Sequence, residues 1–168
     1  MTNGTMAEYW IQALGLESHP EGGWFRETYR SSEEIPATAL PERYGGARCF
    51  GTSIYFLLGP EEVSKFHRIR SDEIWHYYRG DSVTIHLLDE RAGLRSVTLG
   101  PNVESGEVLQ AVVPANLWFG AEVTAERGFC LVGCTVAPGF DFADFELAEP
   151  ETLSARFPTH LDLIRRLT

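Results

Sequence analysis

The sequence predicts an all-β protein built as an antiparallel sandwich or barrel. Between residues 50 and 137, short runs rich in β-branched and aromatic residues alternate with turn signals such as Gly59–Pro60, Gly80–Asp81 and Gly100–Pro101. Short strands repeated at intervals of about 8–12 residues are typical of such folds. The runs are TSIYFLL, SKFHRI, EIWHYYRG, SVTIHLLD, RSVTLG, EVLQAVVP and FCLVGCTV. Because no linker or low-complexity segment divides the chain, we expect residues 1–168 to form one domain.

The segments on either side of these runs predict helices, one more strand and a loop. Residues 6–15 carry apolar side chains at helical spacing and end in Gly15, which predicts a helix. HPEGG (19–23) is typical of a turn, and WFRETYR (24–30) of a strand. Residues 31–48 are polar and rich in proline and glycine, so we expect a long loop. The tail, 151–168, predicts one or two short helices with one apolar face, formed by Leu161, Ile164 and Leu167.

Composition and charge exclude several classes of partner. Hydrophobic residues make up 43% of the chain and charged residues 23%, which is ordinary for a globular protein. The net charge of −10 argues against a nucleic-acid surface and against an anionic membrane surface. No apolar run is long enough to span a membrane, and the N-terminus lacks the basic and apolar regions of a signal peptide. We therefore expect a cytoplasmic protein in which Cys49, Cys130 and Cys134 are buried free thiols.

The stretch HRIRSDEIWHYYRG, from His67 to Gly80, has the most informative spacing in the chain. It holds a histidine, a glutamate six positions later and a glycine seven beyond that. This spacing resembles the first motif of the cupin superfamily, whose members usually bind a metal ion through two histidines, this glutamate and a later histidine. His67 and Glu73 match that motif, but Ile69 stands at its second histidine position. In the second motif Phe119 stands at the histidine position.

Most of residues 16–147 resemble, more narrowly, a small cupin family of unknown function from bacteria, fungi and plants. The matching pieces occur in order: HPEGGWFRETYRS, TSIYFLL, FHRIRSDEIWHYYRGD, VVPANLW and VAPGFDFADFEL. The resemblance implies a double-stranded β-helix, or jelly roll, with short terminal α-helices. It also implies a homodimer with strand 24–30 near the interface. The family is similar in fold to metal-free sugar-nucleotide epimerases related to dTDP-4-dehydrorhamnose 3,5-epimerase.

The same registration predicts an interior pocket with acid–base groups. Residues two apart on a strand share a face, so His67 is expected to point inward, with Glu73 and Tyr77 on a neighbouring strand. His67 could then act as a base, Glu73 could hold its tautomer, and Tyr77 could be the opposing acid. The related epimerases use the same residue types. Four residues are expected to bind the ligand. Trp75, Trp118 and Phe119 would form aromatic walls of the pocket, and Arg26 could bind an anionic group of the substrate.

A metal site needs more ligands than this pattern supplies. Catalytic zinc usually takes three protein ligands, and His67 with Glu73 gives two. His76 could be the third, but strand parity places it on the opposite face from Glu73 unless a bulge intervenes. We therefore expect no metal ion and no other cofactor.

Three functions stay open at this level. The first is a small-molecule-binding cupin that acts as a metal-independent isomerase or epimerase on a sugar-like or other polar metabolite. The second is a non-catalytic ligand-binding or structural cupin, in which His67 and Glu73 form a buried polar pair that is tolerated because it is paired. The third is a metal-dependent cupin enzyme. No nucleotide fingerprint or phosphate-binding glycine loop identifies the ligand.

Overall fold

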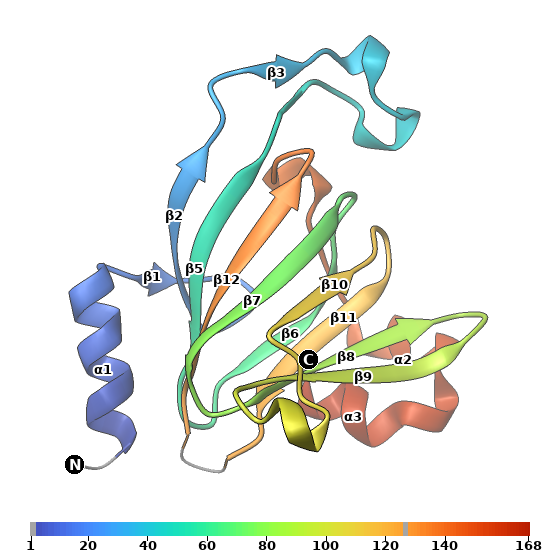
Figure 1. Cartoon of the computed structure of the whole chain (residues 1–168). Coiled ribbons are helices and arrows are strands. Elements are labelled where there is room, and N and C mark those ends of the chain that lie inside the picture. The colour runs from blue at the N-terminus through green and yellow to red at the C-terminus, as the bar shows by residue number, and fades with distance from the viewer. Residues whose placement is uncertain (1–2, 126–127) are drawn as a thin grey trace.

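The computed structural model describes residues 3–125 and 128–168, and two antiparallel sheets dominate it (Figure 1). This confirms the predicted all-β jelly-roll class with short helices. The six-stranded sheet has, in spatial order, β1 (Glu17–Ser18), β2 (Trp24–Arg30), β5 (Thr52–Leu58), β12 (Cys130–Ala137), β7 (Asp72–Gly80) and β10 (Gln110–Val113). The five-stranded sheet has β13 (Glu146–Leu147), β6 (Val63–Arg68), β11 (Trp118–Val123), β8 (Val83–Asp89) and β9 (Gly93–Leu99).

The apolar core lies between these two sheets. Period-two alternation sends one side of each strand inward, so β12 buries Cys130, Val132 and Cys134 against the facing strands. The largest rings of this core are those of Phe56, Trp75 and Phe119. All three are at most 1% exposed.

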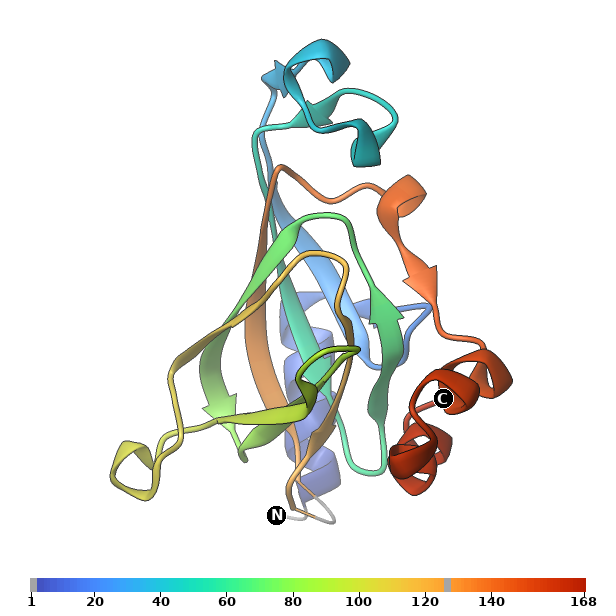
Figure 2. The same cartoon turned by 90° about the vertical axis from the view of Figure 1, so that its right-hand side faces the viewer.

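Three α-helices cover the outer faces rather than the core. α1 (Asn3–Leu14) packs through Ala7 against Leu57 and Leu131 on the outside of the six-stranded sheet. α2 (Pro150–Arg156) and α3 (Leu161–Arg166) cover the outside of the five-stranded sheet (Figure 2). Ile164 and Leu167 are fully buried there, as the apolar face of the tail predicts. None of the helices in residues 3–125 and 128–168 has the length and apolar character needed to cross a bilayer.

Two segments differ from the sequence interpretation. β11 is not among the apolar runs, because its sequence WFGAEV contains Gly120 and Ala121, which have low strand propensity. Tertiary pairing overrides that propensity: β11 lies between β6 and β8, and a Cβ on Gly120 would come within 3.0 Å of the Ser64 carbonyl oxygen. The expected loop 31–48 contains a small two-stranded sheet, β3 (Glu34–Ile35) with β4 (Arg48–Cys49).

The loop around β3 and β4 is fixed to the segment that follows β12. The guanidinium of Arg48 donates to both carboxylate oxygens of Asp144, at 2.7 and 2.6 Å, and to the carbonyl oxygen of Tyr44. Both side chains of this ion pair are at least nine-tenths buried. The pair therefore holds residues 142–145 in place at the end of the sandwich where β3 lies (Figure 1).

Candidate functional site

A pocket opens between the sheets at this end of the sandwich, and His67 lies at its floor. His67 is on β6 opposite Phe119 of β11 and is 2% exposed. Its Nδ1 is 2.7 Å from the carbonyl oxygen of Lys65, which can only accept a hydrogen bond, so Nδ1 carries the proton. The other ring nitrogen, Nε2, is 3.0 Å from Oε2 of Glu21. The backbone thus fixes the tautomer and directs the basic nitrogen at a carboxyl group.

Glu21 comes from the turn between β1 and β2 and is 6% exposed. Its Oε1 accepts a hydrogen bond from Ser64 Oγ at 2.7 Å, and its backbone carbonyl accepts one from the Lys65 N–H. Gly22 allows this close approach: its φ is +103°, and a Cβ there would lie 2.2 Å from the carbonyl oxygen of Val63. The turn is therefore pressed against β6, and the carboxyl group reaches the imidazole.

The electrostatics of this pair favour its neutral form. Burial raises the pKa of Glu21 to about 7, against the opposing effects of His19 and the Ser64 hydrogen bond. Burial also lowers the pKa of His67, although the charge of Glu73 works in the other direction. The Glu21 carboxyl therefore holds the proton and donates it to Nε2 of His67. The two groups titrate as one unit that takes up or releases a proton near neutral pH.

Glu73 faces the same pocket from β7, in the other sheet. It is 8% exposed, and its Cα partners are Val113 and Val136. Burial and then the charge of Glu21 raise the pKa of Glu73 to about 7, while His67 lowers it. The pocket therefore holds a second carboxyl group that is neutral in mildly acidic solution and can be ionised above neutral pH.

Aromatic and aliphatic side chains form the walls, and an ion pair lies at the mouth. The cavity has a volume of about 80 Å³. Arg30 donates to both carboxylate oxygens of Glu27, at 3.0 and 2.8 Å, and to the Phe140 carbonyl oxygen at 3.1 Å. The apolar lining consists of Phe25, Ile54, Phe56, Ile69, Val136, Phe140, Phe142 and Phe145.

His19 completes the pocket beside Glu21. Its Nδ1 accepts a hydrogen bond from the Glu21 backbone N–H at 3.3 Å and lies 3.5 Å from the carboxylate. Its ring packs edge-on against Phe25, with 4.7 Å between the centroids. The sequence pattern marks this histidine only as part of a turn and gives Glu21 no role. The signal in the sequence is the Gly22–Gly23 pair, which permits a tight approach of the turn to another strand.

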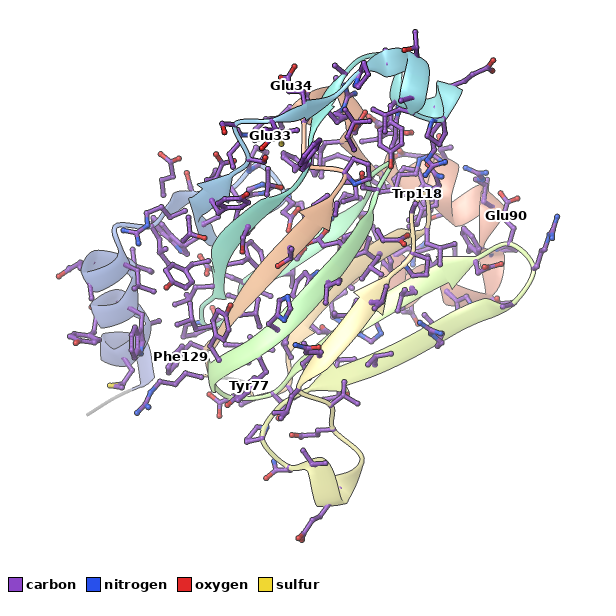
Figure 3. The ribbon with its side chains drawn as sticks, turned by 45° about the horizontal axis from the view of Figure 1, so that its top comes forward. Glu33, Glu34, Tyr77, Glu90, Trp118 and Phe129 are labelled. Atoms are coloured by element: carbon purple, nitrogen blue, oxygen red, sulfur yellow. The ribbon has the colours of Figure 1, made fainter. Side chains whose placement is uncertain are left out.

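The structure brings His67 and Glu73 together but not Tyr77. The Tyr77 hydroxyl donates to the carbonyl oxygen of Gly80 at 2.6 Å, and Figure 3 shows Tyr77 near Phe129, at the end of the sandwich opposite Glu33 and Glu34. A register shift between β7 and β12 beside Tyr77 accompanies this placement. Tyr77 does not line the pocket, so the expected opposing acid is not a pocket residue.

The expected ligand-binding residues are also distributed differently. Trp75 and Phe119 lie behind the pocket in the core, where Phe119 supports the His67 ring at 4.1 Å between centroids. Trp118 packs on the outer face under α2 and α3, because adjacent residues on β11 face opposite sides. Arg26 is exposed on the outer face of β2, over the Tyr55 ring, while Glu27 and Arg30 line the pocket.

The residues present do not supply a usual cupin metal site. His76 lies on the outer face of β7, where it contacts Thr135 and Gln110, as strand parity predicts. Ile69 lines the pocket and Phe119 is fully buried, so two of the usual ligand positions carry apolar side chains. Within residues 3–125 and 128–168, no three His, Cys, Asp or Glu side chains are arranged to hold a metal ion.

Comparison with known families agrees with this geometry. Residues 8–148 match the family described as Cupin superfamily (DUF985). The chain belongs to this cupin family. A curated relative, the uncharacterised protein YML079W of Saccharomyces cerevisiae, is 32% identical over 149 residues, which cover 81% of this chain and 72% of the yeast protein.

Solved structures show the same cupin fold. A hypothetical protein from Leishmania major superposes with a TM-score of 0.87 at 38% identity, covering 96% of this chain and 98% of that one. Protein SO0799 from Shewanella oneidensis gives 0.87 at 39% identity, covering 100% of this chain and 98% of that one. Oxalate decarboxylase from Bacillus subtilis gives 0.54 at 17% identity, covering 90% of this cupin and 36% of the decarboxylase, which shows a shared fold alone.

Proposed function

We propose that this cupin binds a small polar metabolite and moves a proton on it without a metal ion, as an isomerase or epimerase does. The observation that carries the proposal is the floor of the pocket. There the His67–Glu21 pair and Glu73, from opposite sheets, face one cavity, and burial raises the pKa of both carboxyl groups to about 7. Catalytic sites usually combine an apolar cleft with acid–base groups whose pKa values are displaced from their ordinary range.

The proposed chemistry uses these groups in complementary states. The His67–Glu21 pair, once it has lost its shared proton, takes a proton from a carbon atom next to a carbonyl group. The C–H electron pair then forms an enolate, and the protonated Glu73 returns a proton to the opposite face. The C–H bond is remade with inverted configuration, and the two sites have exchanged one proton. Because one group must be deprotonated and the other protonated, the rate should peak near pH 7.

Hydrogen–deuterium exchange tests this proposal on whole classes of candidate substrate. Sugars, hydroxy ketones and amino acids are incubated with the protein in D2O, and loss of carbon-bound protons is followed by NMR. We expect exchange for at least one class with the native chain. His67→Gln keeps a polar partner for Glu21 but cannot take up a proton at neutral pH, so it should lose the exchange while its melting temperature shows that it is folded.

Two results would count against catalysis. A folded His67→Gln protein that exchanges as fast as the native chain removes the imidazole from the mechanism. A native protein that binds a metabolite but exchanges no proton with any class favours the non-catalytic, ligand-binding alternative. In that case the buried pair serves only to hold the turn 19–23 against β6.

We propose further that the protein is a cytoplasmic homodimer with β2 near the interface. Three buried free thiols support the compartment. The outer face of the six-stranded sheet supports the dimer, because it exposes large side chains: Tyr29 is 57% exposed, and Tyr78 and Val112 are each 50% exposed. Light scattering at micromolar concentration should give twice the mass of one chain, and the mass of one chain would contradict the dimer.

A further inference from the structure

The ionised groups of the pocket leave no cation free to hold an anionic ligand. The charged side chains that line it are Glu21, Glu27, Glu73 and Arg30, together with the two histidines. The Arg30 guanidinium is already bound by both oxygens of Glu27 and by the Phe140 carbonyl. Burial lowers the pKa of His19 and of His67, so neither imidazole supplies a stable positive charge. An anion entering this pocket would meet no free positive charge, and above neutral pH it would meet the ionised carboxylate of Glu73.

Three phenylalanine rings pack edge to face at the mouth of the pocket. The centroids of Phe140 and Phe142 are 5.0 Å apart, those of Phe142 and Phe145 6.0 Å, and those of Phe140 and Phe145 6.3 Å. Phe142 is 55% exposed although it is a large apolar residue. The face of an aromatic ring carries negative electrostatic potential and attracts an organic cation within about 6 Å of its centroid. The rings therefore favour the same sign of ligand charge as the carboxylates below them.

A second and independent observation is that polar groups at the floor lack strong partners. The Glu73 side chain is buried and lines the pocket, and within residues 3–125 and 128–168 no strong donor reaches its carboxyl group in normal hydrogen-bonding geometry. The Cys134 thiol and the Trp75 indole lower its pKa as hydrogen-bond donors, but the thiol is a weak donor and the indole N–H is not in good hydrogen-bonding geometry. Buried polar groups are nearly always paired. A buried carboxyl group that lines a cavity and has only these weak partners indicates a ligand that donates to it.

We propose that the ligand of this pocket is an organic cation, a metabolite with a substituted ammonium group that sits between the phenylalanine rings and Glu73. This inference rests on the pocket of the proposed function and narrows its substrate class. Ionised Glu73 supplies the counter-charge while the His67–Glu21 pair keeps its proton, which is the state from which the proposed proton transfer runs in the reverse direction. The phenylalanine rings at the mouth, of which Phe142 is exposed, supply the aromatic surface. A phosphorylated or nucleotide-linked sugar is excluded by the same charges.

Binding of three probes of nearly equal shape tests the sign of the charge. Choline is cationic, 3,3-dimethyl-1-butanol is its neutral counterpart, and 3,3-dimethylbutanoate is anionic. Calorimetric titration of the full chain at pH 8 should give an affinity for choline about tenfold or more above that for the alcohol. The anion should show no binding. Benzylamine and benzyl alcohol form a second pair, which covers primary ammonium groups.

Two variants locate the cation. Glu73→Gln removes the counter-charge and should reduce the preference for choline over the alcohol to less than about threefold. Phe142→Leu keeps the apolar character at the mouth and removes one ring. It should therefore reduce the affinity for choline more than the affinity for the alcohol. Glu34→Gln, on β3 outside the pocket (Figure 3), removes one exposed carboxylate and should leave both affinities unchanged.

The outcomes separate this inference from the proposed proton transfer. If neither cation binds more tightly than its neutral counterpart, or if the anion binds best, the inference is overturned even where proton exchange is observed. If choline binds with the expected preference and no metabolite exchanges a proton, the ligand class stands and the catalytic proposal fails. A choline preference that survives in Glu73→Gln would place the cation elsewhere and would also overturn the assignment.

Discussion

Replacing Glu73 by glutamine should make the folded protein more stable at pH 8. Glutamine has nearly the same shape and stays neutral at every pH. Within residues 3–125 and 128–168, the donors that lower the pKa of Glu73 are the Cys134 thiol and the Trp75 indole, and both can donate to the side-chain oxygen of glutamine as well. The variant therefore isolates the free energy of placing an ionised carboxylate in this pocket.

The magnitude follows from the displaced pKa. Burial and the charge of Glu21 raise the pKa of Glu73 from 4.5 to about 7. At about 1.4 kcal/mol for each pKa unit, this rise corresponds to on the order of 3 kcal/mol. Below pH 4.5 the carboxyl group is neutral in both folded and unfolded chains, so the native chain and the variant should be equally stable. As the pH rises toward 7, the unfolded chain ionises first and the native protein loses stability relative to the variant.

Urea unfolding followed by tryptophan fluorescence at pH 4, 5, 6, 7 and 8 measures this difference. Subtracting the unfolding free energy of the native chain from that of the variant removes most contributions of the other groups that face Glu73, namely Glu21, His67 and Cys134. The repulsion between the Glu21 and Glu73 carboxylates is already contained in the displaced pKa of Glu73, so it adds nothing further to the expected difference. Glu34→Gln is the control for loss of one surface carboxylate. A difference between native chain and Glu73→Gln that stays within about 0.5 kcal/mol from pH 4 to pH 8 would refute the reasoning.

Three other measurements test separate parts of the structure. Arg48→Met should cost about 3–5 kcal/mol of unfolding free energy, because it leaves the Asp144 carboxylate buried without its partner, and Arg48→Met with Asp144→Asn should recover part of the loss. Ile164→Ala, in the fully buried contact of α3, should cost about 2–5 kcal/mol in urea unfolding, and a loss under about 1 kcal/mol would show that α3 contributes little. Elemental analysis of protein purified without chelator should find well under one equivalent of Mn, Fe, Zn or Ni, since Ile69 and Phe119 occupy two ligand positions; near-stoichiometric metal would contradict this.

Much of the fold is predictable because the strands are marked locally. The alternation in β5, β7, β8 and β12 and the glycine turns between them predict a sandwich, and the structure confirms it. Local propensity does not mark β11, because Gly120 and Ala121 are poor strand formers. Only the resemblance to the second cupin motif places Phe119 on a strand, and pairing with two neighbours is what makes β11 one. The sheet β3–β4 escapes prediction for a similar reason: two-residue strands leave no periodic pattern to read.

The sequence by itself determined the strand pattern, the family motifs and the positions of His67 and Glu73, because spacing along the chain encodes all three. Only the tertiary structure decided which groups meet them. Glu21 lies far before His67 in the chain, and nothing local brings them together; Gly22 does so by letting the turn pack against β6. Alternation along β11 requires Trp118 and Phe119 to face opposite sides, but it does not determine which of the two faces the core. A carboxyl group far along the chain reaches an imidazole only through packing, which sequence spacing does not record.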